Sequence, residues 1–216
     1  KKKAKPVPIK EAQEEAHEEA QEQTSDEEAG KMLAEMLGGD GKDLRTMMLY
    51  GDANEERAGD MVAGLLMLHG HRKEEEDADN SIKFYISTYG GSADDMFSVY
   101  DIMRFVKQDC EIETIGMGKI MSAGTLLLAS GTKGKRKIFK NCRVMIHSVS
   151  AGNLGTIHNL ENELEEIQHL QEMYVSALAN ETNMTKRQIR KILDQKVNVY
   201  LTAEEAVEYG LADEVI

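Results

Sequence analysis

Short apolar segments alternate with longer amphipathic ones along most of this 216-residue chain. The short segments have the length and the β-branched and aromatic content of strands, and they comprise residues 45–50, 81–87, 111–117, 137–139 and 142–146. Residues 55–69 and 92–107 between them have the apolar spacing of helices, and the first of these helices is expected to bury Met61, Leu65, Leu66 and Leu68. The repeated strand–helix–strand order predicts an α/β fold with a mainly parallel sheet and right-handed crossovers.

The N-terminal part of the chain has a different composition. Residues 1–10 contain five lysines, whereas residues 11–30 contain nine Asp or Glu residues and no Lys or Arg. This part has no aromatic residue and cannot bury enough apolar surface to offset the entropic cost of ordering. The glycines of residues 38–41 mark a boundary. We therefore expect an acidic, disordered arm over residues 1–43 and one domain over residues 44–216, with a partner-binding helix as the alternative for the arm.

Charge and composition narrow the functional classes. The net charge of −13 argues against general nucleic-acid binding, which needs a basic surface. No run of residues approaches the roughly 18 apolar residues of a membrane helix, and no signal peptide is evident. The chain has only two cysteines, Cys110 and Cys142, which predicts a reducing environment. The expectation is a cytoplasmic protein that binds neither nucleic acid nor a membrane.

A serine stands where the third predicted strand gives way to a short apolar helix. Ser122 lies within the glycine-flanked residues 118–124, and residues 125–130 behind it are mostly apolar. The N-terminus of a helix has free N–H groups and the positive end of the helix dipole, which both favour developing negative charge. Taken alone, a serine at such a place is most often only a helix cap. Whether Ser122 is a helix cap or a functional residue depends on the residues expected near it in the predicted fold.

Four separated blocks of sequence give a more specific signal than this serine does. They comprise residues 84–92 (FYISTYGGS), 118–124 (GKIMSAG), 141–147 (NCRVMIH) and 200–215. In this order and at these spacings, the blocks resemble the proteolytic subunit of Clp protease, the ClpP-like serine peptidases. The resemblance covers about residues 45–216. It implies a crotonase-like α/β fold of ClpP type, with repeated βαβ units and a protruding handle helix, and a site that needs no metal or organic cofactor.

The resemblance also implies roles for individual residues. Ser122 would be the nucleophile and His147 the general base, while the backbone N–H groups of Gly91 and Ala123 would bind the oxygen anion. The chemistry agrees, because a serine hydroxyl is a poor nucleophile until a neighbouring base takes its proton. A neutral imidazole can accept that proton and later give it to the leaving amine.

The substrate is expected to lie extended between residues 90–92 and residues 148–152. Main-chain hydrogen bonds along such segments give affinity with little demand on sequence, which suits a degradative peptidase. Gly90 and Ser148 therefore join the predicted substrate-binding residues. Tyr89 stands where the family usually has proline, so the cleavage preference is not carried over from the resemblance.

The third member of the predicted triad is the position that departs most from the family. Alignment on residues 200–206 places the family's aspartate on Asn198, which can orient the imidazole but brings no negative charge. Asp194 lies four residues earlier, and a shifted loop could bring it to His147 instead. The sequence favours Asn198 and leaves Asp194 as the alternative.

A long helix over residues 154–180 is predicted from apolar residues at steps of three and four. Its stripe comprises Ile157, Leu160, Leu164, Ile167, Leu170, Met173 or Tyr174, and Leu178. In the family that the chain resembles, the equivalent helix projects between stacked rings. The resemblance thus implies a homo-oligomer of heptameric rings stacked as a 14-mer, with an AAA+ unfoldase as a partner. The acidic arm stands where family members have a segment that lines the axial pore. The sequence therefore leaves undecided whether an unfoldase binds.

The predicted function is a serine endopeptidase that cleaves unfolded proteins and peptides through a Ser-His-Asn or Ser-His-Asp site inside a ring. One alternative is a catalytically weak or inactive ClpP-like ring subunit with a structural or regulatory role. Another is a crotonase-type acyl-CoA enzyme, which shares the fold and uses oxyanion N–H groups but no serine–histidine pair. A peptidase assay distinguishes the endopeptidase from an inactive ring subunit. Covalent labelling of Ser122 distinguishes it from an acyl-CoA enzyme.

Overall fold

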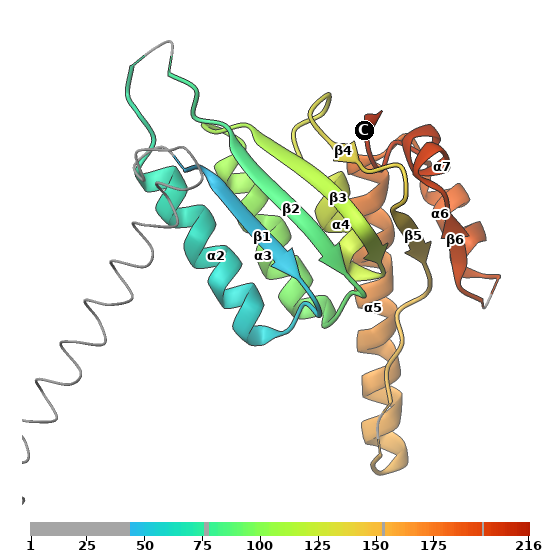
Figure 1. The fold of residues 1–216 in the computed structure, drawn as a ribbon. Coiled ribbons are helices and arrows are strands. Elements are labelled where there is room, and N and C mark those ends of the chain that lie inside the picture. Colours follow the sequence, from blue (N-terminus) through green and yellow to red (C-terminus); the bar gives the residue numbers. More distant parts are fainter. Residues whose placement is uncertain (1–43, 76–77, 153, 196) are drawn as a thin grey trace, which may run out of the picture. The chain divides into compact units, whose positions relative to one another are not determined.

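A seven-stranded sheet forms the centre of the part of the chain that the computed structural model describes, which is residues 44–75, 78–152, 154–195 and 197–216 (Figure 1). The predicted N-terminal arm lies outside these residues. The strands are β1 Thr46–Tyr50, β2 Ile82–Thr88, β3 Ile112–Met121, β4 Lys137–Ile138, β5 Arg143–Ile146, β6 Val199–Leu201 and β7 Glu214–Val215. All neighbouring strands are parallel except β5 and β6, which are antiparallel. The predicted α/β fold with a mostly parallel sheet is confirmed.

Strand β3 holds the two parts of the sheet together. Its residues Ile115 and Gly116 pair with β4, which leads on to β7, whereas residues 119–121 pair with β5. Between these two stretches lies Gly118, with φ +64°, a backbone angle that glycine adopts without steric cost. The strand can therefore continue past Gly118 and change partner. This change brings the end of β3 beside β5.

Six helices complete the described residues, and most of them begin at a side-chain cap. Their bounds are α2 Glu55–Gly70, α3 Ala93–Val106, α4 Ala123–Ala129, α5 Ile157–Glu181, α6 Lys186–Leu193 and α7 Ala203–Glu208. At five of their N-termini, a side-chain oxygen accepts a hydrogen bond from a backbone N–H group of the first turn. Asn, Ser and Thr are preferred at such positions. The caps are Asn54, Ser92, Thr156, Thr185 and Thr202. Only α4, which follows Ser122, lacks such a bond.

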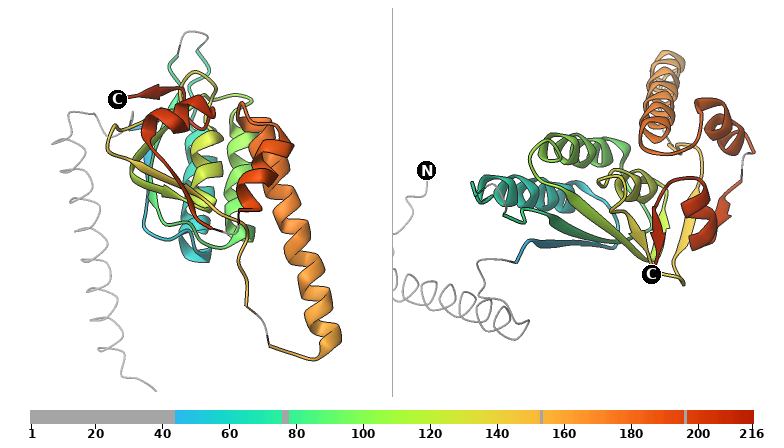
Figure 2. Two further views of the ribbon diagram at one scale, coloured as in Figure 1. Left: turned by 90° about the vertical axis from the view of Figure 1, so that its right-hand side faces the viewer. Right: turned by 90° about the horizontal axis from the view of Figure 1, so that it is seen from above.

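The main core lies between one face of the sheet and helices α2, α3 and α4, which pack side by side (Figure 2). Helix α4 is central to it, because all seven of its residues are buried. Phe84 from β2, Leu65 from α2 and Met103 from α3 are completely buried against this layer. Burial of one such side chain contributes about 1.5–3 kcal/mol, so this layer holds the end of β3 and the start of α4 firmly in place.

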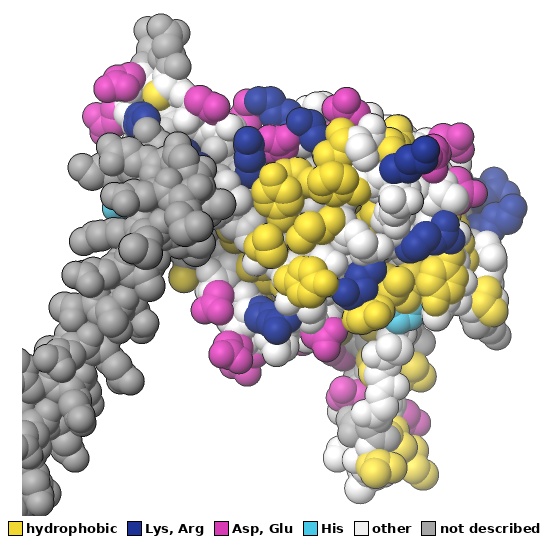
Figure 3. All heavy atoms as spheres, viewed as in Figure 1, with side chains coloured by type: hydrophobic (Ala, Val, Ile, Leu, Met, Phe, Trp, Pro, Cys, Tyr) yellow, Lys and Arg dark blue, Asp and Glu magenta, His cyan; other side chains and the backbone are white. Residues whose placement is uncertain are grey.

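The opposite face of the sheet carries exposed apolar side chains, which gather over the strands in Figure 3. In β1 they alternate with the core residues, since Leu49 is buried while Met48 and Tyr50 are exposed. Large exposed apolar side chains in the strands or directly next to them are Met48, Tyr50, Tyr89, Phe139 and Tyr200.

Helix α5 divides into a projecting half and a buried half, and its N-terminal end extends beyond the body of the domain (Figure 1). Its buried residues all lie at or after Tyr174. On the projecting half, Ile157 is 73% exposed and Leu164 is 55% exposed. The predicted stripe is therefore core at one end and open surface at the other, which agrees with the predicted handle helix.

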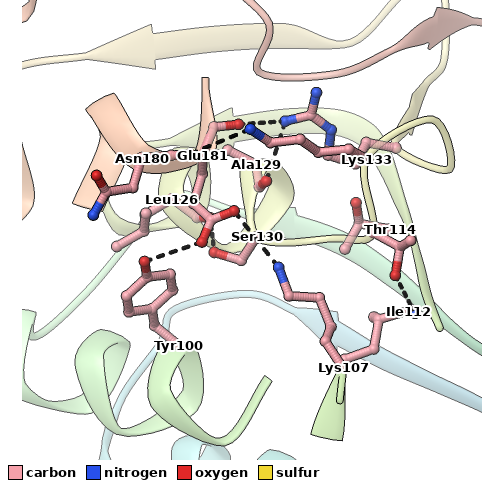
Figure 4. A network of polar contacts seen from close by, with 12 residues as sticks. Tyr100, Lys107, Ile112, Thr114, Leu126, Ala129, Ser130, Lys133, Asn180 and Glu181 are labelled. Carbon is pink, nitrogen blue, oxygen red and sulfur yellow. Dashed lines mark hydrogen bonds and ion pairs between the residues drawn. The ribbon is translucent and has the colours of Figure 1, made fainter. Parts of the chain in front are cut away.

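Buried polar groups tie the C-terminal segments to the rest of the domain. Glu181, at the end of α5, accepts a hydrogen bond of 3.1 Å from the Tyr100 hydroxyl and lies 3.5 Å from the Lys107 ammonium group (Figure 4). Nearby, the Arg136 guanidinium donates to the Asp213 carboxylate, with Nε 2.8 Å from Oδ2. Arg136 is almost fully buried, so this ion pair anchors the residues before β7 to the turn before β4.

Candidate active site

Ser122 occupies a strained turn between β3 and α4. Its φ of 53° and ψ of −121° make it the only non-glycine residue with positive φ in the described ranges. Such a conformation costs on the order of 1–3 kcal/mol and persists where the surrounding fold enforces it, often at functional sites. Unlike the other helix caps, its side chain makes no cap hydrogen bond to the helix behind it. The hydroxyl is therefore free for another partner.

The glycine pair after β2 lets this turn sit against its neighbours. Gly90 has φ +104°, and a Cβ atom added to it would lie 2.6 Å from the Ser122 Cβ. At Gly91 an added Cβ would lie 1.7 Å from the carbonyl oxygen of Ala53. Both contacts are shorter than side chains tolerate, so the two turns can approach this closely only with glycine at these positions.

The partner of the Ser122 hydroxyl is His147, whose Nε2 lies 2.8 Å from Ser122 Oγ. The two residues meet because β3 and β5 are parallel neighbours whose carboxyl ends lie together, with Ser122 N–H donating to the Met145 carbonyl at 2.9 Å. Partial burial lowers the pKa of the His147 imidazole below its usual value. The ring is thus neutral near pH 7, which is the state that can accept a proton.

Two backbone N–H groups belong to residues that line the same cavity as Ser122. The bridge between Ala53 and Gly91 uses the Gly90 carbonyl and the Ser92 N–H, which leaves the Gly91 N–H directed away from Ala53. Ala123 is the first residue of α4, so its N–H has no acceptor within the helix. Gly91 and Ala123 line one cavity together with Ser122 and His147. The predicted oxyanion donors are therefore brought to the predicted nucleophile.

This cavity has a volume of about 130 Å³ and a mostly apolar wall. The apolar lining residues come from α3, α5 and the segment after β5, and they are Ala93, Met96, Val149, Leu170 and Tyr174. Of the two remaining predicted substrate-binding residues, Gly90 packs beneath Ser122, and Ser148 is not part of the lining. Val149 and Ser150 take that place on the wall.

The structure treats the two candidates for the third triad position differently. Within the described ranges, no hydrogen bond joins the His147 ring to Asn198 or Asp194. The antiparallel register of β5 and β6 pairs Ile146 with Val199, and a continuation of this register by one residue would set Asn198 opposite His147. Asp194 is the C-cap of α6. The register therefore favours Asn198, since directly opposed residues of an antiparallel pair point to the same side.

Sequence reasoning missed two polar contacts beside the catalytic turn. The Tyr174 hydroxyl lies 2.6 Å from Thr125 Oγ1, and Thr125 Oγ1 donates to the Ser122 carbonyl at 2.7 Å. In the sequence, Tyr174 looked like one more apolar residue of the long stripe, and Thr125 like part of an apolar helix. The only hint was that Thr125 follows Ser122 by three residues, the spacing at which a side chain can reach back along a helix.

The described residues contain no group of three or more His, Cys, Asp or Glu side chains placed to hold a metal ion. Of the two histidines that are close in sequence, His69 contacts Asp109 at 2.7 Å and His71 contacts the Met67 carbonyl at 2.8 Å. Among the described helices, none combines the length and the apolar character needed to cross a bilayer.

The mostly parallel sheet, its repeated βαβ units and the projecting α5 define an α/β protein of the ClpP type. The chain belongs to the Clp protease family, a family of peptidases, because the Clp protease family model matches residues 34–216. A relative from Corynebacterium glutamicum, named ATP-dependent Clp protease proteolytic subunit 1, is 37% identical over 172 residues, covering 79% of this chain and 78% of the relative.

Two other relatives are similar in extent. Subunit 3 of the ATP-dependent Clp protease from Frankia casuarinae is 39% identical, with 80% of this chain and 76% of the relative covered. Subunit 2 from Corynebacterium jeikeium is 36% identical, with 79% and 78% covered. The sequence resemblance to ClpP-like peptidases is confirmed by these matches.

Proposed function

We propose that this protein is a serine endopeptidase that cleaves peptides and unfolded proteins, with Ser122 as nucleophile and His147 as general base. The observation that carries the proposal is the 2.8 Å distance between Ser122 Oγ and His147 Nε2, on a serine whose side chain is released from helix capping. At this distance the two groups form a hydrogen bond, which is the arrangement expected of a nucleophile and its general base. Membership of a peptidase family supports the same reaction.

The geometry supports acyl transfer in two steps. His147 Nε2 takes the hydroxyl proton while Ser122 Oγ attacks the substrate carbonyl carbon, and the oxygen anion accepts hydrogen bonds from the N–H groups of Gly91 and Ala123. The protonated ring then gives its proton to the leaving amine, which breaks the peptide bond and leaves an acyl ester on Ser122. A water molecule, deprotonated by His147, hydrolyses this ester and restores the serine. Each oxyanion donor of this kind contributes about 10²–10³ in rate.

Asn198 is the group proposed to orient His147. Its amide oxygen can accept the N–H of Nδ1, which leaves Nε2 unprotonated and directed toward Ser122. An amide brings no charge to stabilise the imidazolium, and a neutral substitute in the chymotrypsin example lowers turnover by about 10⁴. We therefore expect a functional but slow peptidase.

The wall of the cavity supports an apolar preference at the residue before the scissile bond. Met96, Leu170 and Val149 offer aliphatic and thioether surface next to Ser122. A charged side chain would lose its hydration there without gaining an ion pair. Peptides with leucine or methionine at this position are thus expected to be cleaved faster than peptides with aspartate or lysine.

Assembly into heptameric rings, stacked as a homo-oligomeric 14-mer, is proposed from the exposed end of α5. Ile157, Leu160 and Leu164 place large apolar side chains on a segment that projects from the domain. Exposed apolar surface of this kind is typical of protein–protein contacts. The relatives are named subunits of an ATP-dependent protease, and by analogy an AAA+ unfoldase is the proposed partner and the cytoplasm the proposed location.

One observation favours a second candidate function. With the neutral Asn198 at the third position, the site could be too weak for degradation, and the chain would serve as a structural or regulatory ring subunit beside active ones. An assay of the isolated protein separates the two, because a regulatory subunit would be inactive alone. The serine–histidine hydrogen bond also favours a hydrolase over a crotonase-type acyl-CoA enzyme.

Active-site labelling is the direct test of the nucleophile. A fluorophosphonate probe should attach to Ser122 in the native protein, and Ser122→Ala and His147→Ala should each abolish labelling while the fold is retained. Ser98→Ala is the matched control, because the Ser98 hydroxyl lies on α3 and donates only to the Asp95 carbonyl. Labelling that persists in Ser122→Ala would refute the assignment.

A further inference from the structure

The carbonyl group of Ser122 is held by more donors than a helix alone provides. The Thr125 N–H donates to it at 3.0 Å, and Thr125 Oγ1 donates to it at 2.7 Å. The Tyr174 hydroxyl, from α5, lies 3.4 Å from the same carbonyl oxygen and 2.6 Å from Thr125 Oγ1. Bonds from residue i+3 are common at helix starts, but the tyrosine reaches in from a separate helix 49 residues further along the chain.

The direction of these hydrogen bonds follows from the number of protons available. Thr125 Oγ1 has one hydrogen, and it is directed at the Ser122 carbonyl. Either hydroxyl could donate in the 2.6 Å contact between Tyr174 and Thr125. If Thr125 donated, the carbonyl would keep only the longer 3.4 Å contact with the tyrosine, whereas donation by Tyr174 uses both short contacts, so we assign Tyr174 as the donor to Thr125 Oγ1. Burial raises the pKa of Tyr174 to about 12 and outweighs the hydrogen bond with Thr125, which lowers the pKa. The hydroxyl therefore keeps its hydrogen throughout the neutral pH range. The result is a relay from Tyr174 to Thr125 to the Ser122 carbonyl.

The carbonyl that receives this relay belongs to the same peptide unit as the Ala123 N–H. A peptide unit is planar, and in the trans form its C=O and N–H point in opposite directions. When the Ser122 oxygen is fixed, the direction of the Ala123 N–H is fixed too. Rotation of this peptide changes ψ of Ser122, which is −121° at a φ of 53°. A non-glycine residue with this φ prefers a ψ of about +30 to +60°, so rotation of the peptide toward that value would relieve strain, and an external restraint is needed to prevent it.

We propose that Thr125 and Tyr174 are positioning residues that hold the Ser122–Ala123 peptide with its N–H directed at the developing oxygen anion. The proposal rests on the proposed peptidase function, which it extends by naming what preorganises one oxyanion donor. Neither residue needs to touch the reacting atoms. Preorganised donors stabilise the transition state more than the bound substrate, so their loss lowers kcat more than it raises KM.

The central variant is Tyr174→Phe, which removes the hydroxyl and keeps the ring that lines the cavity. We expect kcat for a fluorogenic peptide to fall about tenfold, a part of the full loss of an oxyanion donor, with KM within about twofold of the native value. Affinity for a peptide aldehyde, whose adduct with Ser122 places an oxygen anion at the same donors, should weaken by the same factor as kcat/KM.

Two further variants separate positioning from packing. Thr125→Val removes the relay and should lower kcat at least as far as Tyr174→Phe, whereas Thr125→Ser keeps the hydroxyl and should retain native turnover. The double variant Thr125→Val/Tyr174→Phe should be no slower than Thr125→Val, because the tyrosine acts through the threonine. Tyr100→Phe is the matched control: it removes an equally buried tyrosine hydroxyl, which bonds to Glu181 (Figure 4), and should leave kcat unchanged.

The outcomes distinguish this inference from the proposed function. Native turnover that is lost in Ser122→Ala but unaffected in Tyr174→Phe would overturn the positioning role alone. The same holds if Tyr174→Phe raises KM without lowering kcat, or if Thr125→Ser is as slow as Thr125→Val. Absence of turnover and of fluorophosphonate labelling in the native protein would overturn the proposed function, and the positioning role with it.

Discussion

Gly90 lies directly against Ser122, so that a methyl group on Gly90 would come within 2.6 Å of the serine Cβ atom. The glycine turn after β2 and the serine turn after β3 are therefore built as one unit. The glycine turn has no side chain at Gly90, and this leaves room for the strained conformation of Ser122. This closeness also sets the distance between the two proposed oxyanion donors, because Gly91 and Ala123 follow these two residues.

The first prediction concerns this contact. Gly90→Ala should lower peptide turnover by at least about 10²-fold, because the new Cβ would push Ser122 away from His147 and disturb an oxyanion donor. Gly134→Ala is the matched control: Gly134 also has positive φ, at +86°, but nothing lies within 4 Å of an added Cβ. That variant should lose about 1–2 kcal/mol of stability, as any non-glycine residue does there, and keep its activity. Equal activities of the two variants would contradict the prediction.

The second prediction concerns pH. Since burial lowers the pKa of His147, the neutral base is present below the usual titration range. The acid limb of kcat/KM should therefore have its midpoint below about 6.5, with activity rising as the pH rises through it. Asn198→Asp would place a carboxylate opposite the ring, favour the imidazolium, and move this midpoint to higher pH while leaving turnover similar or higher.

Asp194→Asn serves as the control for that pH profile. If Asn198 orients the imidazole, Asp194→Asn should leave both the midpoint and the turnover unchanged. Loss of activity in Asp194→Asn, with intact assembly, would reassign the third position to Asp194.

The third prediction concerns stability. Burial would raise the pKa of Asp213, but hydrogen bonds from Arg136 outweigh this and hold the pKa below its usual value. The pair thus stabilises the fold above about pH 4, and this contribution is lost as the pH falls through the lowered pKa. Asp213→Ala should cost about 3–5 kcal/mol near pH 7, because it leaves the buried Arg136 without its counter-ion.

Denaturant unfolding checks this value, with Glu172→Ala as the comparison. Glu172 pairs with Arg190 at 2.6 Å, but both side chains are about half exposed, so the loss should stay below about 1 kcal/mol. Similar losses in the two variants, or an Asp213→Ala effect that does not shrink as the pH falls below about 4, would contradict the account.

The fourth prediction concerns assembly. Leu164→Asp places a charge in the exposed apolar stripe of α5 and should lower the assembled mass seen by sedimentation. Asn162→Asp introduces the same group on the same projecting half, away from the stripe, and should leave the mass unchanged. A native protein that sediments as a monomer at micromolar concentration and still cleaves peptide would show that the ring assignment is wrong.

The sequence predicted the sheet and its order of elements because each long segment has a clear period. It missed β6 and β7, which have three and two residues, whereas the equally short β4 was predicted as residues 137–139. It also placed Leu66 in the core, although this side chain is 42% exposed. Helix α2 buries only Ala58, Met61 and Leu65 along one line, and Leu66 lies just off that line.

The proximity of Ser122 and His147 could be predicted because each directly follows a strand, and the ends of neighbouring parallel strands meet in space. For the third position, the sequence favoured Asn198 over Asp194, and the register of β5 and β6 supports the same proposal. Tyr174 and Thr125 could not be paired from the sequence. Their contact depends on how α5 crosses α4, and both positions fit an apolar pattern.

The measurement that tests the account most directly is hydrolysis of a fluorogenic peptide by the native protein, Ser122→Ala, His147→Ala and the double variant. The serine and the histidine act as a unit, so each single change should remove nearly all turnover and the double change should be scarcely worse. All four proteins should show the same assembled mass. Turnover by Ser122→Ala at the native rate would contradict the central claim.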